Sequence, residues 1–194
     1  MILLVDIGNT RVKWATQVDG RLSPQRAAGY AQWSAVDWQH ELFDGPPVER
    51  VLAATVAGGD SRQALETAAR KAGIRRVDFV TSTAALAGVR NAYPDPGLLG
   101  VDRWVAVIGA YHLAQAACCV VDVGTAATLD AVDASGQHLG GFIVPGPQLM
   151  VRSLHAGTNN LAAYTAASPV GGTQLFADNT RDAIERGCRV ALAA

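Results

Sequence analysis

Long apolar runs and cysteine are scarce in this sequence, and a basic leader segment is missing. No apolar stretch approaches the roughly 20 residues that a membrane-spanning helix needs. The apolar start, Met1–Val5, meets Asp6 at once with no basic segment before it, so we expect no signal peptide. Three cysteines in 194 residues cannot form a disulfide framework, and reduced thiols suit the cytoplasm. We therefore expect a cytoplasmic protein that does not associate with a membrane.

Charge of one sign is lacking as well. Sixteen Lys and Arg residues stand against seventeen Asp and Glu residues, and the basic ones are scattered along the chain. Nucleic acid and anionic membranes are therefore not expected partners. The lysines are Lys13 and Lys71 alone, and no G-x-x-x-x-G-K-[ST] motif occurs, which excludes a P-loop protein. G-x-G-x-x-G, H-E-x-x-H and G-x-S-x-G are absent too, so we expect a small-molecule partner bound in another way.

The sequence does contain a regular alternation of strand and helix patterns. This alternation is typical of an α/β fold, and the length allows one large domain or two small ones. The predicted strands are Ile2–Val5, Arg11–Gln17, Val51–Val56, Val77–Thr81, Cys118–Val121, Thr128–Val132 and Gln137–Val144. The predicted helices are Tyr30–Phe43, Ser61–Ala72, Asp102–Gln115, Met150–Leu154 and Asn179–Ala194, with a loop over Arg90–Val101.

One pattern occurs twice, at matching places in the two halves of the chain. Leu4–Thr10 and Val120–Ala126 both read apolar-apolar-Asp-apolar-Gly followed by small, mostly polar residues. An aspartate at a strand end can hold a cation, and a glycine turn leaves backbone N–H groups free to face phosphate oxygens. Alternatively, aspartate and glycine in either copy simply make a hairpin turn. The duplication favours two loops that grip a polyphosphate.

Duplicated Asp-x-Gly loops resemble the acetate kinase, sugar kinase, Hsp70 and actin superfamily. Several further segments resemble a narrower family, the type III pantothenate kinases, also called the Bvg accessory factor family. These segments are Asp6–Lys13, Gly100–Trp104, Asp122–Thr125, Gly140–Gly146 and Asn179–Gly187. The resemblance implies two ribonuclease-H-like domains, at residues 1–116 and 117–194. Chains of the family usually continue beyond the helix that begins near Asn179, so we expect the second domain to be truncated at its C-terminus.

The resemblance implies an enzyme that phosphorylates pantothenate with ATP at the start of coenzyme A synthesis. Magnesium and a monovalent cation, K⁺ or NH₄⁺, are the implied cofactors. Asp6 would face the magnesium ion, and Asp122 would hold the monovalent cation. The implied ATP-binding residues are Asp6, Ile7, Gly8, Asn9, Thr10, Arg11, Val12, Lys13 and Thr125.

On the pantothenate side, the resemblance makes Asp102 the general base and Arg103 the residue that binds the substrate carboxylate. The implied substrate-binding residues are Tyr93, Gly100, Val101, Asp102, Arg103 and Thr180. Asp102 and Thr180 each have a structural alternative, because each stands at the start of a predicted helix and could cap its N-terminus.

Two rival functions remain open, and we expect a homodimer. The rivals are another small-molecule kinase of the same superfamily and a non-catalytic regulatory protein that keeps the fold. A homodimer is expected from the resemblance and from two apolar segments of the second half, Met150–Leu154 and Leu161–Tyr164.

Overall fold

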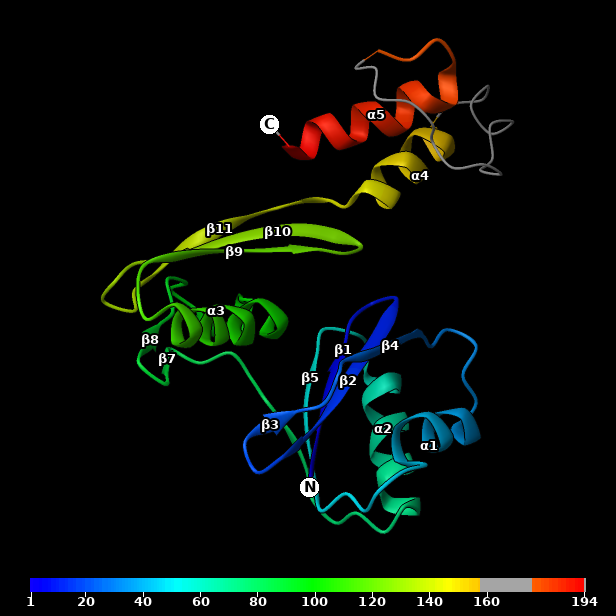
Figure 1. Ribbon diagram of the computed structural model, residues 1–194, viewed down its shortest axis with the longest axis vertical. Coiled ribbons are helices and arrows are strands. Elements are labelled where there is room, and N and C mark those ends of the chain that lie inside the picture. Colours follow the sequence, from blue (N-terminus) through cyan, green and yellow to red (C-terminus); the bar gives the residue numbers. More distant parts are fainter. Residues whose placement is uncertain (158–175, 194) are drawn as a thin grey trace. The chain divides into compact units, whose positions relative to one another are not determined.

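The structure, a computed structural model, describes residues 1–157 and 176–193 (Figure 1). The chain divides into two compact units, which we describe separately. The first contains Met1–Cys118 and Ala131–Gly140, and the second contains Cys119–Asp130 and Gly141–Ala194. Among the described residues, no helix has the length and apolar character needed to cross a membrane.

A mixed β-sheet forms the centre of the first unit. β1 runs antiparallel to β2, with Ile2 opposite Gln17 and Ile7 opposite Val12, and parallel to β5, which is itself parallel to β6. The order of strands is β3-β2-β1-β5-β6, and β4 pairs with β2. The bounds are β1 Ile2–Ile7, β2 Arg11–Val18, β3 Arg21–Leu22, β4 Arg26–Gly29, β5 Arg50–Thr55 and β6 Val77–Phe79.

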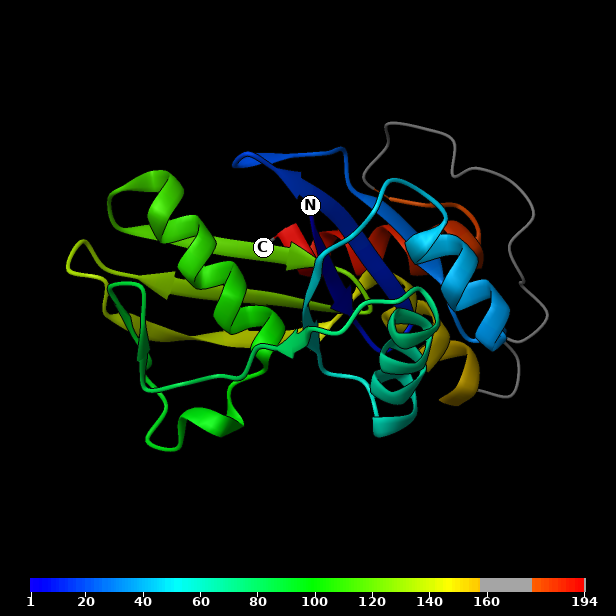
Figure 2. The same ribbon diagram turned by 90° about the horizontal axis from the view of Figure 1, so that it is seen from below.

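Two helices, α1 (Ala35–Phe43) and α2 (Gly59–Lys71), lie side by side next to this sheet (Figures 1 and 2). Alternate residues of β1 face them, because successive side chains of a strand point to opposite faces. Leu3, Val5 and Ile7 form one buried cluster with side chains of both helices, among them Trp38, Leu42, Leu65 and Ala68. Each large apolar side chain buried in this way contributes about 1.5–3 kcal/mol to stability. The core therefore holds β1, and with it Asp6, in a fixed position.

Helix α1 begins later than the apolar pattern predicts. The Ser34 hydroxyl accepts the Asp37 N–H, and the Asp37 carboxylate accepts the Ser34 N–H at 2.7 Å, which is a reciprocal N-terminal cap. The helix starts at Ala35 for this reason, and Tyr30, which we predicted to be helical, lies before it. Burial raises the pKa of the Tyr30 hydroxyl.

An aspartate joins the two parallel strands at the edge of the sheet. The Asp78 carboxylate of β6 accepts hydrogen bonds from Arg50 Nε at 2.6 Å and from Arg76 Nε at 2.9 Å. These hydrogen bonds and charges, that of Arg50 first, hold the pKa of the Asp78 carboxyl below its usual value. The ion pairs link the start of β5 to β6.

The rest of the first unit contains a small hairpin and one longer helix. β7 (Ala85–Leu86) and β8 (Val89–Arg90) are joined by Ala87 and Gly88, both with positive φ, at 50° and 80°. Two such residues form the tight turn whose twist matches that of paired strands. The predicted loop that follows contains one short 3₁₀ turn, η1 (Pro96–Leu98), and α3 then runs over Val101–Ala114.

Three consecutive strands follow α3 and lie in the order β11-β10-β9. Two residues, Gly124 and Thr125, separate β9 from β10, so the predicted turn after Asp122 is confirmed. The second unit ends with two helices, of which the first extends well beyond the predicted Met150–Leu154. The bounds are β9 Cys118–Val123, β10 Ala126–Val132, β11 His138–Pro145, α4 Pro147–Gly157 and α5 Thr180–Ala193.

Candidate active site

The first Asp-x-Gly segment forms a tight turn between β1 and β2. Asp6 is the next-to-last residue of β1, and Gly8 N–H donates to the Arg11 carbonyl oxygen at 3.0 Å across the turn. Asn9, Thr10 and Arg11 are exposed, whereas Ile7 and Val12 on either side are buried. The core thus fixes both ends of a loop whose tip is open to solvent, as a phosphate-binding loop requires.

Tyr30 fixes the orientation of one peptide group in this turn. Its hydroxyl donates to the Gly8 carbonyl oxygen at 2.7 Å. In a planar trans peptide the N–H points opposite to the carbonyl, so the Asn9 N–H is directed away from Tyr30. The sequence did not reveal this contact, which joins residues 22 positions apart.

Lys13 lies across the hairpin from Asp6. The two residues are direct partners in the register of β1 and β2, and Lys13 Nζ stands 3.7 Å from Asp6 Oδ2. Both side chains are more than one-third exposed, so the ion pair itself adds little stability. The ion pair instead matters for position, because it places an ammonium group and a carboxylate together beside the turn.

The second Asp-x-Gly segment repeats this construction in the second unit. Asp122 is again the next-to-last residue of its strand, and Gly124 N–H donates to the Ala126 carbonyl oxygen at 2.9 Å. Gly146, which precedes α4, donates its N–H to the Thr125 carbonyl oxygen at 2.9 Å. A Cβ on Gly146 would collide with the Gly124 carbonyl oxygen and lie 2.8 Å from that of Thr125. Only glycine therefore allows the chain before α4 to pack against this loop.

Asp102 lies in the first turn of α3 but does not cap it. The N-cap residue is Gly100, which makes no side-chain capping bond, and Asp102 is the second residue of the helix. Its Oδ1 accepts the backbone N–H of Arg103 at 2.8 Å. The alternative role that we considered for Asp102, that of an N-cap, is therefore wrong, because the helix begins earlier than predicted.

Tyr93 and Arg103, both predicted to bind the substrate, are in contact. Arg103 Nη1 donates to Tyr93 Oη at 3.2 Å, and Arg103 is only 7% exposed. His138, which the sequence did not single out, stacks on Tyr93 with ring centroids 6.3 Å apart and planes 11° apart. The N–H of Ala92 also donates to His138 Nδ1, at 3.4 Å. The segment before η1 is thus held from both α3 and β11.

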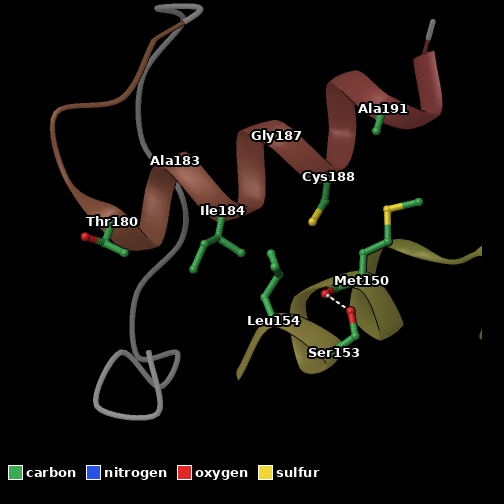
Figure 3. Close-up of a pocket in the computed structure, with 9 residues that line it drawn as sticks. All are labelled: Met150, Ser153, Leu154, Thr180, Ala183, Ile184, Gly187, Cys188 and Ala191. Carbon is green, nitrogen blue, oxygen red and sulfur yellow. Dashed lines mark hydrogen bonds between the residues drawn. The ribbon is translucent and has the colours of Figure 1, made fainter. Parts of the chain in front are cut away.

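Thr180 begins α5, and the neighbouring Asn179 caps that helix. Asn179 Oδ1 accepts the Asp182 N–H at 3.0 Å, so the capping role that we considered for Thr180 is also wrong. Thr180 lines a groove of about 570 Å³ between α4 and α5 (Figure 3). The other lining residues are Met150, Ser153, Leu154, Ala183, Ile184, Gly187, Cys188 and Ala191. Burial raises the pKa of the Cys188 thiol. The apolar segment Met150–Leu154 contributes to this groove, whereas Leu161–Tyr164 lies outside the described residues.

The predicted site residues therefore form four local groups. In the first unit, Asp6–Lys13 forms one loop, and Tyr93 joins Gly100–Arg103 at the start of α3. In the second unit, Asp122 and Thr125 flank the second turn, and Thr180 lies at the groove.

Two solved structures share the fold of this chain. A Campylobacter jejuni protein, described as a Baf family transcriptional activator, has a TM-score of 0.55 and 21% identity, over 98% of this chain and 75% of that one. A 2-dehydro-3-deoxygalactonokinase protein from Sinorhizobium meliloti has a TM-score of 0.54 and 15% identity, over 100% of this chain and 80% of that one. This chain therefore has the mixed α/β fold of these two proteins.

Sequence comparison then gives the family. The family model described as type III pantothenate kinase matches residues 2–194. The type III pantothenate kinase of Aromatoleum aromaticum is 41% identical, over 100% of this chain and 76% of that protein. The type III pantothenate kinase of Azoarcus sp. is 40% identical, over 100% of this chain and 71% of that protein. This chain belongs to the type III pantothenate kinase family.

Proposed function

We propose that this chain phosphorylates pantothenate with ATP to give 4′-phosphopantothenate, the first step of coenzyme A biosynthesis. Membership of the family supports the reaction and its two substrates. The observation that carries the proposal is the hydrogen bond from Arg103 Nη1 to Tyr93 Oη, at 3.2 Å. It joins two residues from different segments that are expected to bind pantothenate, directly beside Asp102, the expected base.

The two Asp-x-Gly turns hold ATP in this proposal. Backbone N–H groups of Asp6–Lys13, together with Thr125, face the phosphates, and Tyr30 directs the Asn9 N–H outward by fixing the Gly8 carbonyl. Lys13 adds a positive charge beside the first turn. Phosphoryl transfer needs such groups because negative charge spreads over the transferred phosphate oxygens.

A divalent cation, implied by the family, fits the neighbourhood of Asp6. Mg²⁺ is usually held by one or two carboxylates, phosphate oxygens and water, not by a cage of protein ligands. Across residues 1–157 and 176–193, no three His, Cys, Asp or Glu side chains gather where they could hold a metal ion. Asp6 would therefore hold Mg²⁺ through its hydration water, and the ion would neutralise charge on the phosphates.

Asp122 occupies the corresponding place in the second turn, and we propose that it holds K⁺ or NH₄⁺. The turn places main-chain carbonyl oxygen atoms, among them that of Thr125, next to the end of the strand, and oxygen atoms are the ligands that such cations prefer. The cation would stabilise negative charge on the phosphate oxygens.

Asp102 is the proposed general base. The primary hydroxyl oxygen of pantothenate bonds to the γ-phosphorus of ATP, the bond to the β–γ bridging oxygen breaks, and ADP leaves. Asp102 takes the hydroxyl proton. Gly100 and Val101 contribute main-chain contacts to the substrate, and the Arg103 guanidinium, a planar fork of N–H donors, pairs with the substrate carboxylate.

The proposed assembly is a cytoplasmic homodimer of chains, each with two ribonuclease-H-like domains, that binds neither nucleic acid nor membranes. The strand order β3-β2-β1 in the first unit and the order β11-β10-β9 support the internal duplication. The groove at α4 and α5 is mostly apolar, which supports a contact there with a second subunit that would bring Thr180 near a substrate.

A coupled assay of ADP release tests the function. Purified protein with ATP, Mg²⁺ and K⁺ should release ADP only when pantothenate is added. 2-Dehydro-3-deoxygalactonate serves as the control acceptor, because a kinase whose name includes it shares the fold. ADP release that depends on the sugar acid and not on pantothenate would establish the rival kinase. If neither acceptor led to ADP release, the result would favour a non-catalytic regulatory protein.

A further inference from the structure

Gly100 stands immediately before α3, where its backbone does not require glycine. Its φ of −53° and ψ of 130° are accessible to any L-residue. It also makes no side-chain capping bond, although serine, threonine, asparagine and aspartate are preferred at such a position. Neither the backbone conformation nor a side-chain capping bond therefore requires glycine at this position.

The space beside Gly100 is filled by the side chain of Asp102. A Cβ on Gly100 would lie 2.6 Å from Asp102 Oδ1 and 3.8 Å from its Cγ. The first distance is well inside van der Waals contact, so the two groups cannot occupy these positions together. The carboxylate, at the end of a short rotatable side chain, would turn away while the backbone stayed in place. It would then lose the Arg103 N–H, which Oδ1 now accepts at 2.8 Å.

We infer that Gly100 is a positioning residue for the reaction: its missing side chain leaves the space in which the Asp102 carboxylate faces the substrate hydroxyl. This inference rests on the proposed function, because it takes Asp102 as the base. A base must lie within hydrogen-bond reach of the proton that it removes. A displacement of about 1 Å can lower the rate on the order of 100-fold.

The chain contains a matched control position at the start of α2. Gly58 is also an N-cap glycine with no side-chain capping bond, at φ −62° and ψ 168°. A Cβ there would meet no atom within 4 Å. Gly58→Ala and Gly100→Ala therefore change the same kind of helix terminus, and only the second crowds a carboxylate.

Steady-state kinetics of the two variants test the inference. Gly100→Ala should lower kcat for pantothenate phosphorylation by about 10- to 100-fold, with KM for ATP unchanged. Gly58→Ala should keep the wild-type kcat, and both variants should melt within a few degrees of each other. In the Asp102→Ala background, which lacks the carboxylate, Gly100→Ala should change kcat by less than about 2-fold.

A second measurement detects the hydrogen bond between the Arg103 N–H and the Asp102 carboxylate and does not depend on enzyme activity. The amide proton of Arg103 should show the downfield NMR shift of a hydrogen-bonded N–H in the wild type and in Gly58→Ala, and should lose it in Gly100→Ala. Wild-type kcat in Gly100→Ala, or an equal loss of kcat with and without the Asp102 carboxylate, would overturn the inference while leaving the proposed function intact. A wild-type protein that does not phosphorylate pantothenate would overturn both.

Discussion

Replacing Asp102 by asparagine separates its proposed chemistry from its place in the helix. Asparagine keeps an oxygen that can accept the Arg103 N–H, which Asp102 Oδ1 accepts at 2.8 Å. The helix loses only a negative charge in its first turn, which is worth about 0.3–1 kcal/mol near a helix N-terminus. In a chain of this size, that corresponds to a fall in Tm of about 1–4 °C.

The effect on turnover should be far larger, because asparagine cannot take the hydroxyl proton. General base catalysis contributes about 10²–10⁴-fold, and we expect the lower end, since phosphoryl transfer has a loose transition state. The assay pairs kcat for pantothenate with Tm and with ATP binding, which should stay unchanged. Asp60→Asn is the matched control, because Asp60 is likewise the second residue of a helix that follows a glycine N-cap. Near-normal turnover of Asp102→Asn would refute the role of base.

Three further changes test other parts of the site and the fold. Tyr30→Phe removes a hydrogen bond to the Gly8 carbonyl oxygen that is worth about 0.5–1.5 kcal/mol. In steady-state kinetics, KM for ATP should therefore rise by about 2- to 13-fold, while kcat for pantothenate should change little. An unchanged KM for ATP would exclude Tyr30 from positioning the loop. Asp122→Ala should abolish the difference between K⁺ and Na⁺ in the rate of ADP release, whereas full wild-type activity in Na⁺ alone would contradict the cation site. Asp78→Asn should lower Tm at neutral pH, measured by thermal melting across a pH series. The folded-state pKa of Asp78 is lowered, chiefly by Arg50, so its stabilisation is complete above the unfolded value of about 3.9 and is lost as the pH falls through the lower folded value. The two melting curves should therefore converge in acid, and a constant difference at every pH would contradict the assignment.

The sequence was most informative where local chemistry determines structure. The aspartates at residues 6 and 122 were predicted at strand ends, and each is the next-to-last residue of its strand. The apolar runs and the Asp-x-Gly breaks suffice for this, because an apolar run ended by aspartate and glycine is typical of a strand followed by a turn. Helix α3 also matched to within one residue at each end.

Tertiary contacts account for most of what the sequence could not reveal. Tyr30 lies in an apolar pattern that predicts a helix, but the Ser34–Asp37 cap starts the helix after it. The Tyr30 hydroxyl can therefore donate to the Gly8 carbonyl oxygen. The stacking of His138 on Tyr93 depends on bringing together residues about 45 positions apart, which no periodicity can indicate. The space at Gly100 is likewise a property of packing, visible only with the Asp102 side chain in place.

The claim that this chain transfers phosphate to pantothenate is tested most directly by ³¹P NMR of the products. The primary alcohol of pantothenate would become a phosphomonoester, whose phosphorus couples to the two protons of the adjacent carbon. With ATP, Mg²⁺ and K⁺ present, we predict a new triplet that grows with the ADP signals and is absent without pantothenate. ADP formation accompanied only by the singlet of inorganic phosphate would contradict the proposed transfer.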